Sequence, residues 1–163
     1  MSAKPESDVQ QLEHLRPMSS EDLTELMVGE LAAYPHPWTR GNFEDCLSNK
    51  AYSCWVFEQQ ESIYGHVVIS TVLKEAHILN ICLYPEHQNK GWGRKLLSET
   101  ESIAKSNGAE TCFLEVRPSN KSGMHLYQSE AYNEIGLRKN YYPADKGRED
   151  AIVMAKTLVI NSL

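Results

Sequence analysis

The chain has 163 residues, a formal net charge of -6 and 41% hydrophobic residues. This length suits one domain, large enough to bury a core without disulfides or metals. The acidic balance argues against direct contact with nucleic acid.

The N-terminal residues lack the features of a targeting or membrane segment. Residues 1–9 are polar, without the apolar stretch of a secretory signal. We expect them to form a flexible tail in front of a single domain over residues 10–163. The longest apolar-leaning run, residues 66–73, is far too short to cross a bilayer. We therefore expect a cytoplasmic protein that contacts no membrane.

The next part of the chain predicts a strand and two helices. The strand shows weak alternation over residues 10–16. Ser19 and Asp22 then resemble a capping box, and apolar residues at helical spacing continue that helix to about residue 33. Thr39 can cap a second, short helix.

The remainder of the chain predicts strands and helices in alternation. Three strands joined by short turns predict an antiparallel meander, over residues 52–57, 63–73 and 76–83. The later elements are helices over residues 91–107 and 120–130, strands over 111–116, 132–137 and 151–158, and a polar loop over 139–150. This order predicts an α/β fold (α+β in some schemes), with a mixed, mostly antiparallel sheet flanked by helices and one parallel crossover.

The four cysteines do not follow a metal-binding or redox spacing. They are Cys46, Cys54, Cys82 and Cys112, and no two form a Cys-x-x-Cys pair. The histidines are scattered, and none pairs at metal spacing. We therefore expect neither a metal site nor a cysteine nucleophile.

The clearest motif is Gln88-x-x-Gly91-x-Gly93, which lies between a predicted strand and a predicted helix. Glycines let the backbone approach a ligand, and the first turn of a helix offers free N–H groups and a positive dipole end. Lys90 and Arg94 add positive charge there. Such a turn can bind a pyrophosphate, although the motif alone fits a plain turn equally well.

Two common nucleotide-binding motifs do not match this turn. A Rossmann fingerprint requires a third glycine where Leu96 stands. A Walker A loop ends in Gly-Lys-Ser/Thr, which is absent from the sequence.

The glycine-rich turn after a strand resembles the acetyl-CoA motif of the GNAT superfamily of acetyltransferases. Three further stretches carry the same resemblance: Asn80-Ile81-Cys82-Leu83-Tyr84-Pro85, Leu114-Glu115-Val116-Arg117-Pro118-Ser119-Asn120 and Leu126-Tyr127. Three others are similar to its subfamily of ribosomal-protein-alanine N-acetyltransferases: Arg138-Lys139-Asn140-Tyr141-Tyr142-Pro143, Gly147-Arg148-Glu149-Asp150-Ala151 and His36-Pro37-Trp38. The resemblance covers residues 13–158.

The resemblance implies the GNAT acyl-CoA N-acyltransferase fold, with acetyl-CoA as co-substrate and no metal. The implied acetyl-CoA contacts are Ile81, Cys82, Leu83, Gln88, Asn89, Lys90, Gly91, Trp92, Gly93, Arg94 and Asn120. The implied acceptor contacts are Trp38, Arg138, Tyr141 and Tyr142, the last three on the loop before the final strand. A backbone N–H near Cys82 or Leu83 is expected to hold the oxyanion. Asn120 equally fits the N-cap of its helix.

Amide formation requires a neutral amine, and an α-amine has an ordinary pKa of about 8. A base must therefore remove a proton, and the resemblance implies that Glu115 is this base. Alternatively, Glu115 faces solvent or pairs with Arg117. The resemblance implies that Tyr127 is the acid that protonates the leaving thiolate, whereas the helical spacing by itself favours a core aromatic.

The expected partner is the N-terminus of a ribosomal protein, the alanine of small-subunit ribosomal protein eighteen. An Nε-lysine or small-amine acetyltransferase and a non-catalytic CoA-binding sensor are the alternatives. We expect a monomer or a weak dimer.

Two positions depart from the family pattern. Ala131 stands where members often have a glycine at the end of a helix, so that helix is expected to close differently. Trp92 is bulky inside the glycine-rich turn, and we expect its side chain to point away from the phosphates.

Overall fold

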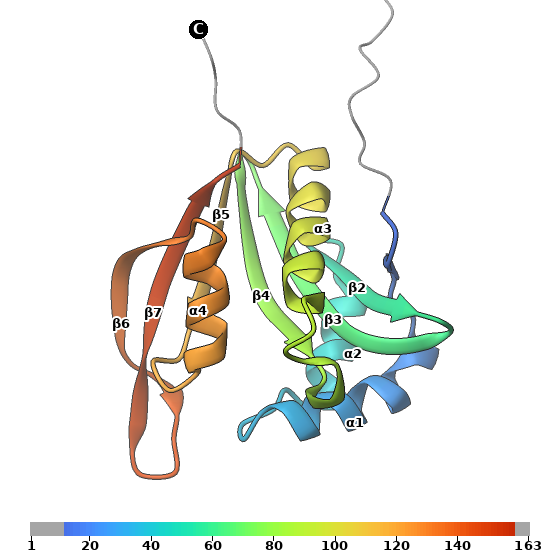
Figure 1. Cartoon of the computed structure of the whole chain (residues 1–163), viewed down its shortest axis with the longest axis horizontal. Coiled ribbons are helices and arrows are strands. Elements are labelled where there is room, and N and C mark those ends of the chain that lie inside the picture. The colour runs from blue at the N-terminus through green and yellow to red at the C-terminus, as the bar shows by residue number, and fades with distance from the viewer. Residues whose placement is uncertain (1–11, 159–163) are drawn as a thin grey trace, which may run out of the picture.

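The strands join into one seven-stranded sheet, in the order β1-β2-β3-β4-β5-β7-β6 (Figure 1). The computed structural model describes residues 12–158, so the expected tail and the start of the first expected strand lie outside the described residues. The strands are β1 (Leu15–Pro17), β2 (Tyr52–Gln59), β3 (Ser62–Val72), β4 (Glu75–Leu83), β5 (Thr111–Val116), β6 (Asn133–Pro143) and β7 (Arg148–Thr157). The pairing of β4 with β5 is parallel and the other neighbours are antiparallel, which confirms the mixed sheet and the meander.

The helices begin where the sequence predicts. They are α1 (Leu23–Ala33), α2 (Arg40–Ser48), α3 (Trp92–Ser106) and α4 (Lys121–Ser129), with 3₁₀ turns at Ser20–Asp22 and Pro85–His87. The capping box of Ser19 and Asp22 forms in front of α1. The Thr39 hydroxyl accepts a hydrogen bond from the backbone N–H of Asn42 at 3.1 Å, which caps α2. Within the described residues, no helix is both long and apolar enough to cross a bilayer.

Helices cover both faces of the sheet, and alternation along β3 separates the two cores. Val67 is buried among residues of α3 and α4, whereas its neighbour Val68 is buried among residues of α1 and α2. The first core includes Phe57, Leu96, Leu97, Ile103 and Tyr127, and the second includes Leu23, Leu26, Phe43, Val56 and Cys82.

The predicted polar loop over residues 139–150 is wrong. Strand β6 continues to Pro143 and β7 begins at Arg148, so residues 144–147 alone connect them. The implied acceptor residues Arg138, Tyr141 and Tyr142 therefore lie on β6 and not on a loop. The strand predicted over residues 132–137 is confirmed as the first half of β6, and the sequence conceals its continuation because β6 is an almost fully exposed edge and its register shifts between Arg138 and Tyr142. No buried face remains to impose a hydrophobic alternation.

Candidate active site

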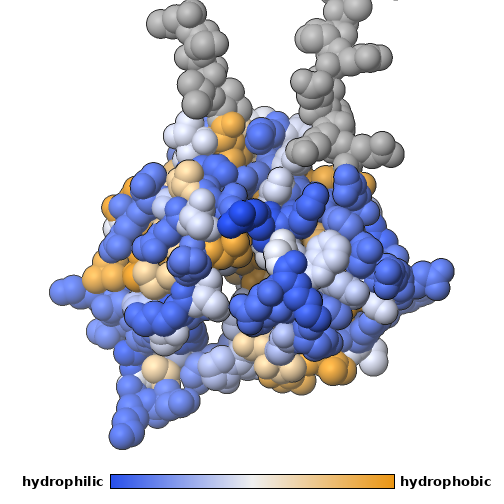
Figure 2. Space-filling model, viewed as in Figure 1, coloured by the Kyte–Doolittle hydropathy of each residue, from blue (hydrophilic) through white to orange (hydrophobic). Residues whose placement is uncertain are grey.

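Strands β4 and β5 separate in the middle of the sheet. Their pairing ends where Ile78 faces Leu114, although β4 continues to Leu83 and β5 to Val116. Figure 1 shows the two strands diverging, and Figure 2 shows the surface hollowed over the same place. The divergence leaves one edge of each strand without a neighbouring strand, and we call this place the opening.

The backbone of β4 faces the opening at alternate residues. The Tyr84 N–H donates to the Tyr64 carbonyl of β3 at 2.9 Å. In an antiparallel pair the hydrogen-bonding direction alternates, so the backbone groups of Ile81 and Leu83 point away from β3. Two hydrogen bonds agree: the Gln88 amide donates to the Leu83 carbonyl at 2.8 Å, and the Tyr34 hydroxyl donates to the Ile81 carbonyl.

The glycine-rich turn holds a conformation that suits a phosphate ligand. Gly91 is the N-cap of α3 and has a left-handed φ of 86°, and Asn89 has a φ of 61°. A Cβ on Gly93 would lie 3.3 Å from the Leu126 side chain, so a larger residue would crowd α4. The first turn of α3 contains no acidic residue. Its N–H groups can therefore receive a pyrophosphate, and the cradle fits the acetyl-CoA that the turn predicts.

The basic side chains of Lys90 and Arg94 lie beside this turn, as the sequence predicts. Lys90 donates to the Glu86 carbonyl at 3.1 Å and remains exposed. Arg94 forms an ion pair with Glu130 at 2.6 Å, and its side chain is also largely exposed. Both side chains can reorient toward an anion, because exposed ion pairs are weak.

The Trp92 side chain points into the core and away from the turn, in agreement with the expectation. Its ring makes edge-on contacts with three aromatic rings, at centroid distances of 5.3 Å to His14, 6.0 Å to Phe57 and 5.8 Å to Tyr64. The bulky residue therefore anchors α3 while its backbone remains part of the turn.

Glu115 lies on the face of β5 opposite to Leu114 and Val116, and so opposite to the core under α3 and α4. Its side chain is 24% exposed and pairs with Arg138 of β6 at 3.1 Å. The alternative partner, Arg117, pairs instead with Glu149 at 3.4 Å. Glu115 is thus neither free in solvent nor paired with Arg117.

Tyr127 reaches the opening from α4. The residue is only 7% exposed and packs in the core, as its helical spacing predicts. Burial raises its pKa well above the ordinary value, and the nearby Tyr142 and Cys82 raise the pKa further. Tyr34, at the end of α1, is close enough for Cys82 and Tyr127 to add to the effect of burial on its own pKa. Tyr34, Tyr127 and Tyr142 are therefore close enough to affect one another's charge, and nothing in the sequence predicted Tyr34 as a neighbour of this site.

Asn120 caps α4, as one of its two expected roles requires. Its side-chain oxygen accepts a hydrogen bond from the Gly123 N–H at 3.0 Å. A Cβ on Gly123 would lie 2.6 Å from the Asn120 amide, so the glycine makes room for this cap.

The expected acceptor residues lie on two segments that meet. The α1–α2 connection approaches the β6–β7 turn, where His36 and Asp145 are 3.6 Å apart. In the first segment, the ring of Trp38 packs against Phe43 at 5.2 Å. In the second, the guanidinium of Arg117 lies 4.3 Å from the Tyr142 ring and that of Arg138 5.3 Å from the Tyr141 ring.

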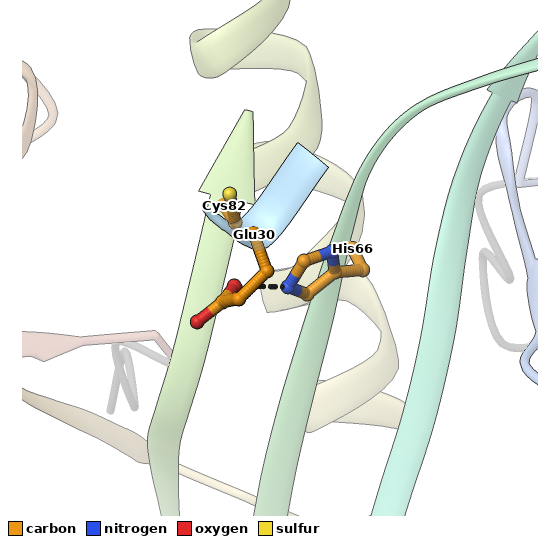
Figure 3. A group of neighbouring side chains, drawn as sticks. All are labelled: Glu30, His66 and Cys82. Atoms are coloured by element: carbon orange, nitrogen blue, oxygen red, sulfur yellow. Dashed lines mark hydrogen bonds and ion pairs between the residues drawn. The ribbon is translucent and has the colours of Figure 1, made fainter. Parts of the chain in front are cut away.

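A buried polar cluster lies beside this site, and the sequence spacing concealed it. Glu30 of α1, His66 of β3 and Cys82 of β4 meet in the core under α1 and α2 (Figure 3). Nε2 of His66 lies 2.8 Å from Oε2 of Glu30. Burial raises the pKa of the Cys82 thiol, and Glu30 raises it further, so this thiol is a poor nucleophile.

Comparisons with known proteins agree with this geometry. Residues 18–131 match the model of the Acetyltransferase (GNAT) family. The chain is 36% identical to the [ribosomal protein bS18]-alanine N-acetyltransferase of Escherichia coli strain K12, over 85% of this chain and 95% of that protein. It is 32% identical to a putative enzyme of the same name from Bacillus subtilis strain 168, over 88% and 95% of the two chains.

A solved structure gives the same result. The crystal structure of the ribosomal-protein-S18-alanine N-acetyltransferase from Escherichia coli superposes with a TM-score of 0.82 at 32% identity, covering 91% of this chain and 95% of that one. The family uses acetyl-CoA as co-substrate. The divergent strands, the glycine-rich turn and these matches lead to one conclusion: the chain belongs to the GNAT family and is an N-acetyltransferase.

Proposed function

We propose that this enzyme transfers the acetyl group of acetyl-CoA to the N-terminal α-amine of a protein, the alanine of ribosomal protein bS18. The names of the relatives above support this acceptor. The main support for this reaction is the opening between β4 and β5, with Glu115 on one side and Tyr127 on the other.

In this proposal the two substrates approach the opening from opposite faces of the sheet. The pyrophosphate lies on the first turn of α3, on the face that α3 and α4 cover. The acceptor enters between the α1–α2 connection and the β6–β7 hairpin, on the face toward which Glu115 points. Trp38, Arg138, Tyr141 and Tyr142 lie on these two segments and would contact the acceptor peptide.

The reaction is then a direct attack. Glu115 takes a proton from the α-ammonium group, directly or through a water molecule, and the neutral amine attacks the thioester carbonyl carbon. The Leu83 N–H stabilises the resulting oxyanion, because it points into the opening whereas the Cys82 N–H points to β3. The carbon–sulfur bond breaks, and Tyr127 donates its proton to the departing thiolate of CoA. The raised pKa of Tyr127 keeps this proton in place until that step.

A steady-state assay tests the roles, with acetyl-CoA and a basic peptide that begins with alanine. Glu115→Gln and Tyr127→Phe should each lower kcat by about a hundredfold or more, because general acid–base catalysis contributes that much. Glu134→Gln and Tyr52→Phe alter exposed residues far from the opening and serve as matched controls. An unchanged kcat in both Glu115→Gln and Tyr127→Phe would contradict the roles assigned to these residues.

The same assay separates the alternative functions. An N-terminally blocked peptide with an internal lysine, or a polyamine, should be acetylated at least an order of magnitude less efficiently than the alanine peptide. A preference for lysine or polyamine would replace the proposed acceptor. CoA binding without turnover on any amine would indicate a sensor.

A further inference from the structure

Three side chains of different ligand types converge between α1 and the sheet. Glu30 is 1% exposed, His66 0% and Cys82 1%. One ligand atom from each lies within 4.8 Å of the other two. The three come from separate elements, and in Figure 3 the carboxylate of Glu30 faces the ring of His66 while Cys82 lies beside them. This cluster of Glu30, His66 and Cys82 is separate from the proposed catalytic pair.

We propose that this cluster binds a zinc ion. Zinc takes nitrogen, sulfur and oxygen ligands in tetrahedral geometry, with bonds of about 2.0–2.3 Å that place the ligand atoms about 3.3–3.7 Å apart. Zinc binding would need Nε2 of His66 and Oε2 of Glu30, now 2.8 Å apart, to move apart by about half an ångström, and the Cys82 sulfur, now within 4.8 Å of both, to turn toward them. The sulfur ligand disfavours magnesium and calcium, which prefer oxygen.

Outer hydrogen bonds already orient two of the three ligands, His66 and Glu30. Nδ1 of His66 lies 2.9 Å from the Tyr84 hydroxyl, which leaves Nε2 directed at the cluster. Oε1 of Glu30 accepts hydrogen bonds from the Trp38 N–H at 3.1 Å and the Asn80 amide at 3.2 Å, which leaves Oε2 directed at the same point. Zinc sites commonly fix their ligands by such outer hydrogen bonds.

Charge and ligand number also fit zinc. A carboxylate, a thiolate and a neutral imidazole carry two negative charges and balance one Zn²⁺, as a buried site requires. Zinc displaces the thiol proton of Cys82, and this proton passes to solvent as the zinc–sulfur bond forms. The side-chain oxygen of Asn80 is buried and has no hydrogen-bond partner among residues 12–158. Because the amide nitrogen of the same side chain contacts Glu30 at 3.2 Å, we assign this oxygen as the fourth ligand in the proposal.

Bound zinc would tie α1, β3 and β4 together next to the active site. Cys82 lies between Ile81 and Leu83, whose backbones face the opening, and Glu30 holds the backbone of Trp38 on the acceptor side. The zinc would thus be structural, stiffening the acceptor side of the opening without taking part in acetyl transfer.

Metal titration of the full-length chain tests this site. Chelator-treated protein should take up one zinc ion, measured by calorimetry and elemental analysis, and its melting temperature should rise by roughly 5–10 °C at about a hundredfold excess of zinc over Kd. Cobalt(II), which replaces zinc, should give an intense thiolate-to-metal charge-transfer band and the visible bands of a tetrahedral ion. Cys82→Ala should abolish the charge-transfer band and weaken zinc binding by about a hundredfold or more.

The matched control is Cys112→Ala, which removes a buried cysteine outside the cluster and should retain the cobalt spectrum. Wild-type protein without the charge-transfer band, or with equal zinc affinity in Cys82→Ala, would overturn the proposal, and the wild-type spectrum is decisive even if a variant fails to fold. Both readouts are independent of acetyl transfer, so they stand apart from the proposed function.

Discussion

Two glycines at opposite ends of α3 share one local conformation. Gly91 precedes the helix with a φ of 86°, and Gly108 follows it with a φ of 92°. A Cβ at either position would meet no atom within 4 Å. An alanine at either position would therefore be strained by its backbone and not by packing, at about 1–2 kcal/mol. Only Gly91 lies at the proposed phosphate site.

This pair separates conformational strain from ligand binding. Gly91→Ala and Gly108→Ala should lower the free energy of unfolding by similar amounts, about 1–2 kcal/mol in urea denaturation. Gly91→Ala should also raise the KM for acetyl-CoA by about tenfold, because relief of the strain moves the N–H groups of the turn. Gly108→Ala should leave this KM unchanged, and an equal KM in both variants would contradict the phosphate site.

At the scale of an element, α4 ends in a Schellman motif that lacks its usual glycine. Ala131 has a left-handed φ of 70°. The Tyr132 N–H bonds the Tyr127 carbonyl at 3.0 Å, and the Ala131 N–H bonds the Gln128 carbonyl at 3.2 Å. The helix thus closes as a glycine would close it, and the expectation of a different closure is wrong. These two bonds and the packing of Tyr132 hold Ala131 in a conformation that alanine disfavours.

Ala131→Gly should therefore stabilise the protein. The substitution relieves left-handed strain, and we expect the free energy of unfolding to rise by about 1 kcal/mol and the melting temperature by about 2–4 °C. Ala32→Gly, at an exposed position inside α1, is the matched control and should destabilise by about 0.5–1 kcal/mol. Destabilisation by both substitutions would mean that the αL residue carries no strain.

At the scale of the whole molecule, burial raises the pKa of several phenols and thiols. Tyr84, Tyr127 and Tyr132 are all less than 9% exposed, and burial is the main cause of the raised pKa of each. Burial also raises the pKa of the Cys112 thiol from 9.0 to about 11. The unfolded chain therefore loses these protons at a lower pH than the folded chain. Stability is fully present below the ordinary pKa values and is lost as the pH rises above them.

We expect alkaline pH to weaken the fold progressively. Between the ordinary pKa of Cys112, 9.0, and its raised value of about 11, this thiol should remove about 1.4 kcal/mol of stability per pH unit, and the tyrosines should add to this loss above 10.0. Urea denaturation at a series of pH values across this range measures how the free energy of unfolding depends on pH. Cys112→Ala should lessen the slope of the first part of this profile, to which the buried Cys82 and Cys54 thiols also contribute, and a wild-type profile that stays level throughout would contradict the effect of burial.

Local patterns in the sequence were sufficient for most elements and for the conformation of the glycine-rich turn. The capping boxes, the glycines around α3 and the alternation in β2 to β5 lie within a few residues, where propensity and period act directly. The family resemblance supplied Glu115 and Tyr127, and the fold brings both to the opening. The second half of the edge strand β6, beyond the predicted strand over residues 132–137, escaped prediction because its exposed side chains show no period.

The sequence by itself determined the order of the elements, the glycine-rich turn at the start of α3 and the membership of a family of acetyltransferases. Only the tertiary structure decided that Arg138 pairs with Glu115, that the Tyr34 hydroxyl bonds the Ile81 carbonyl, and that Glu30, His66 and Cys82 form one cluster. These contacts join residues many positions apart. Their distances depend on strand register and on the divergence of β4 from β5, which no local pattern records.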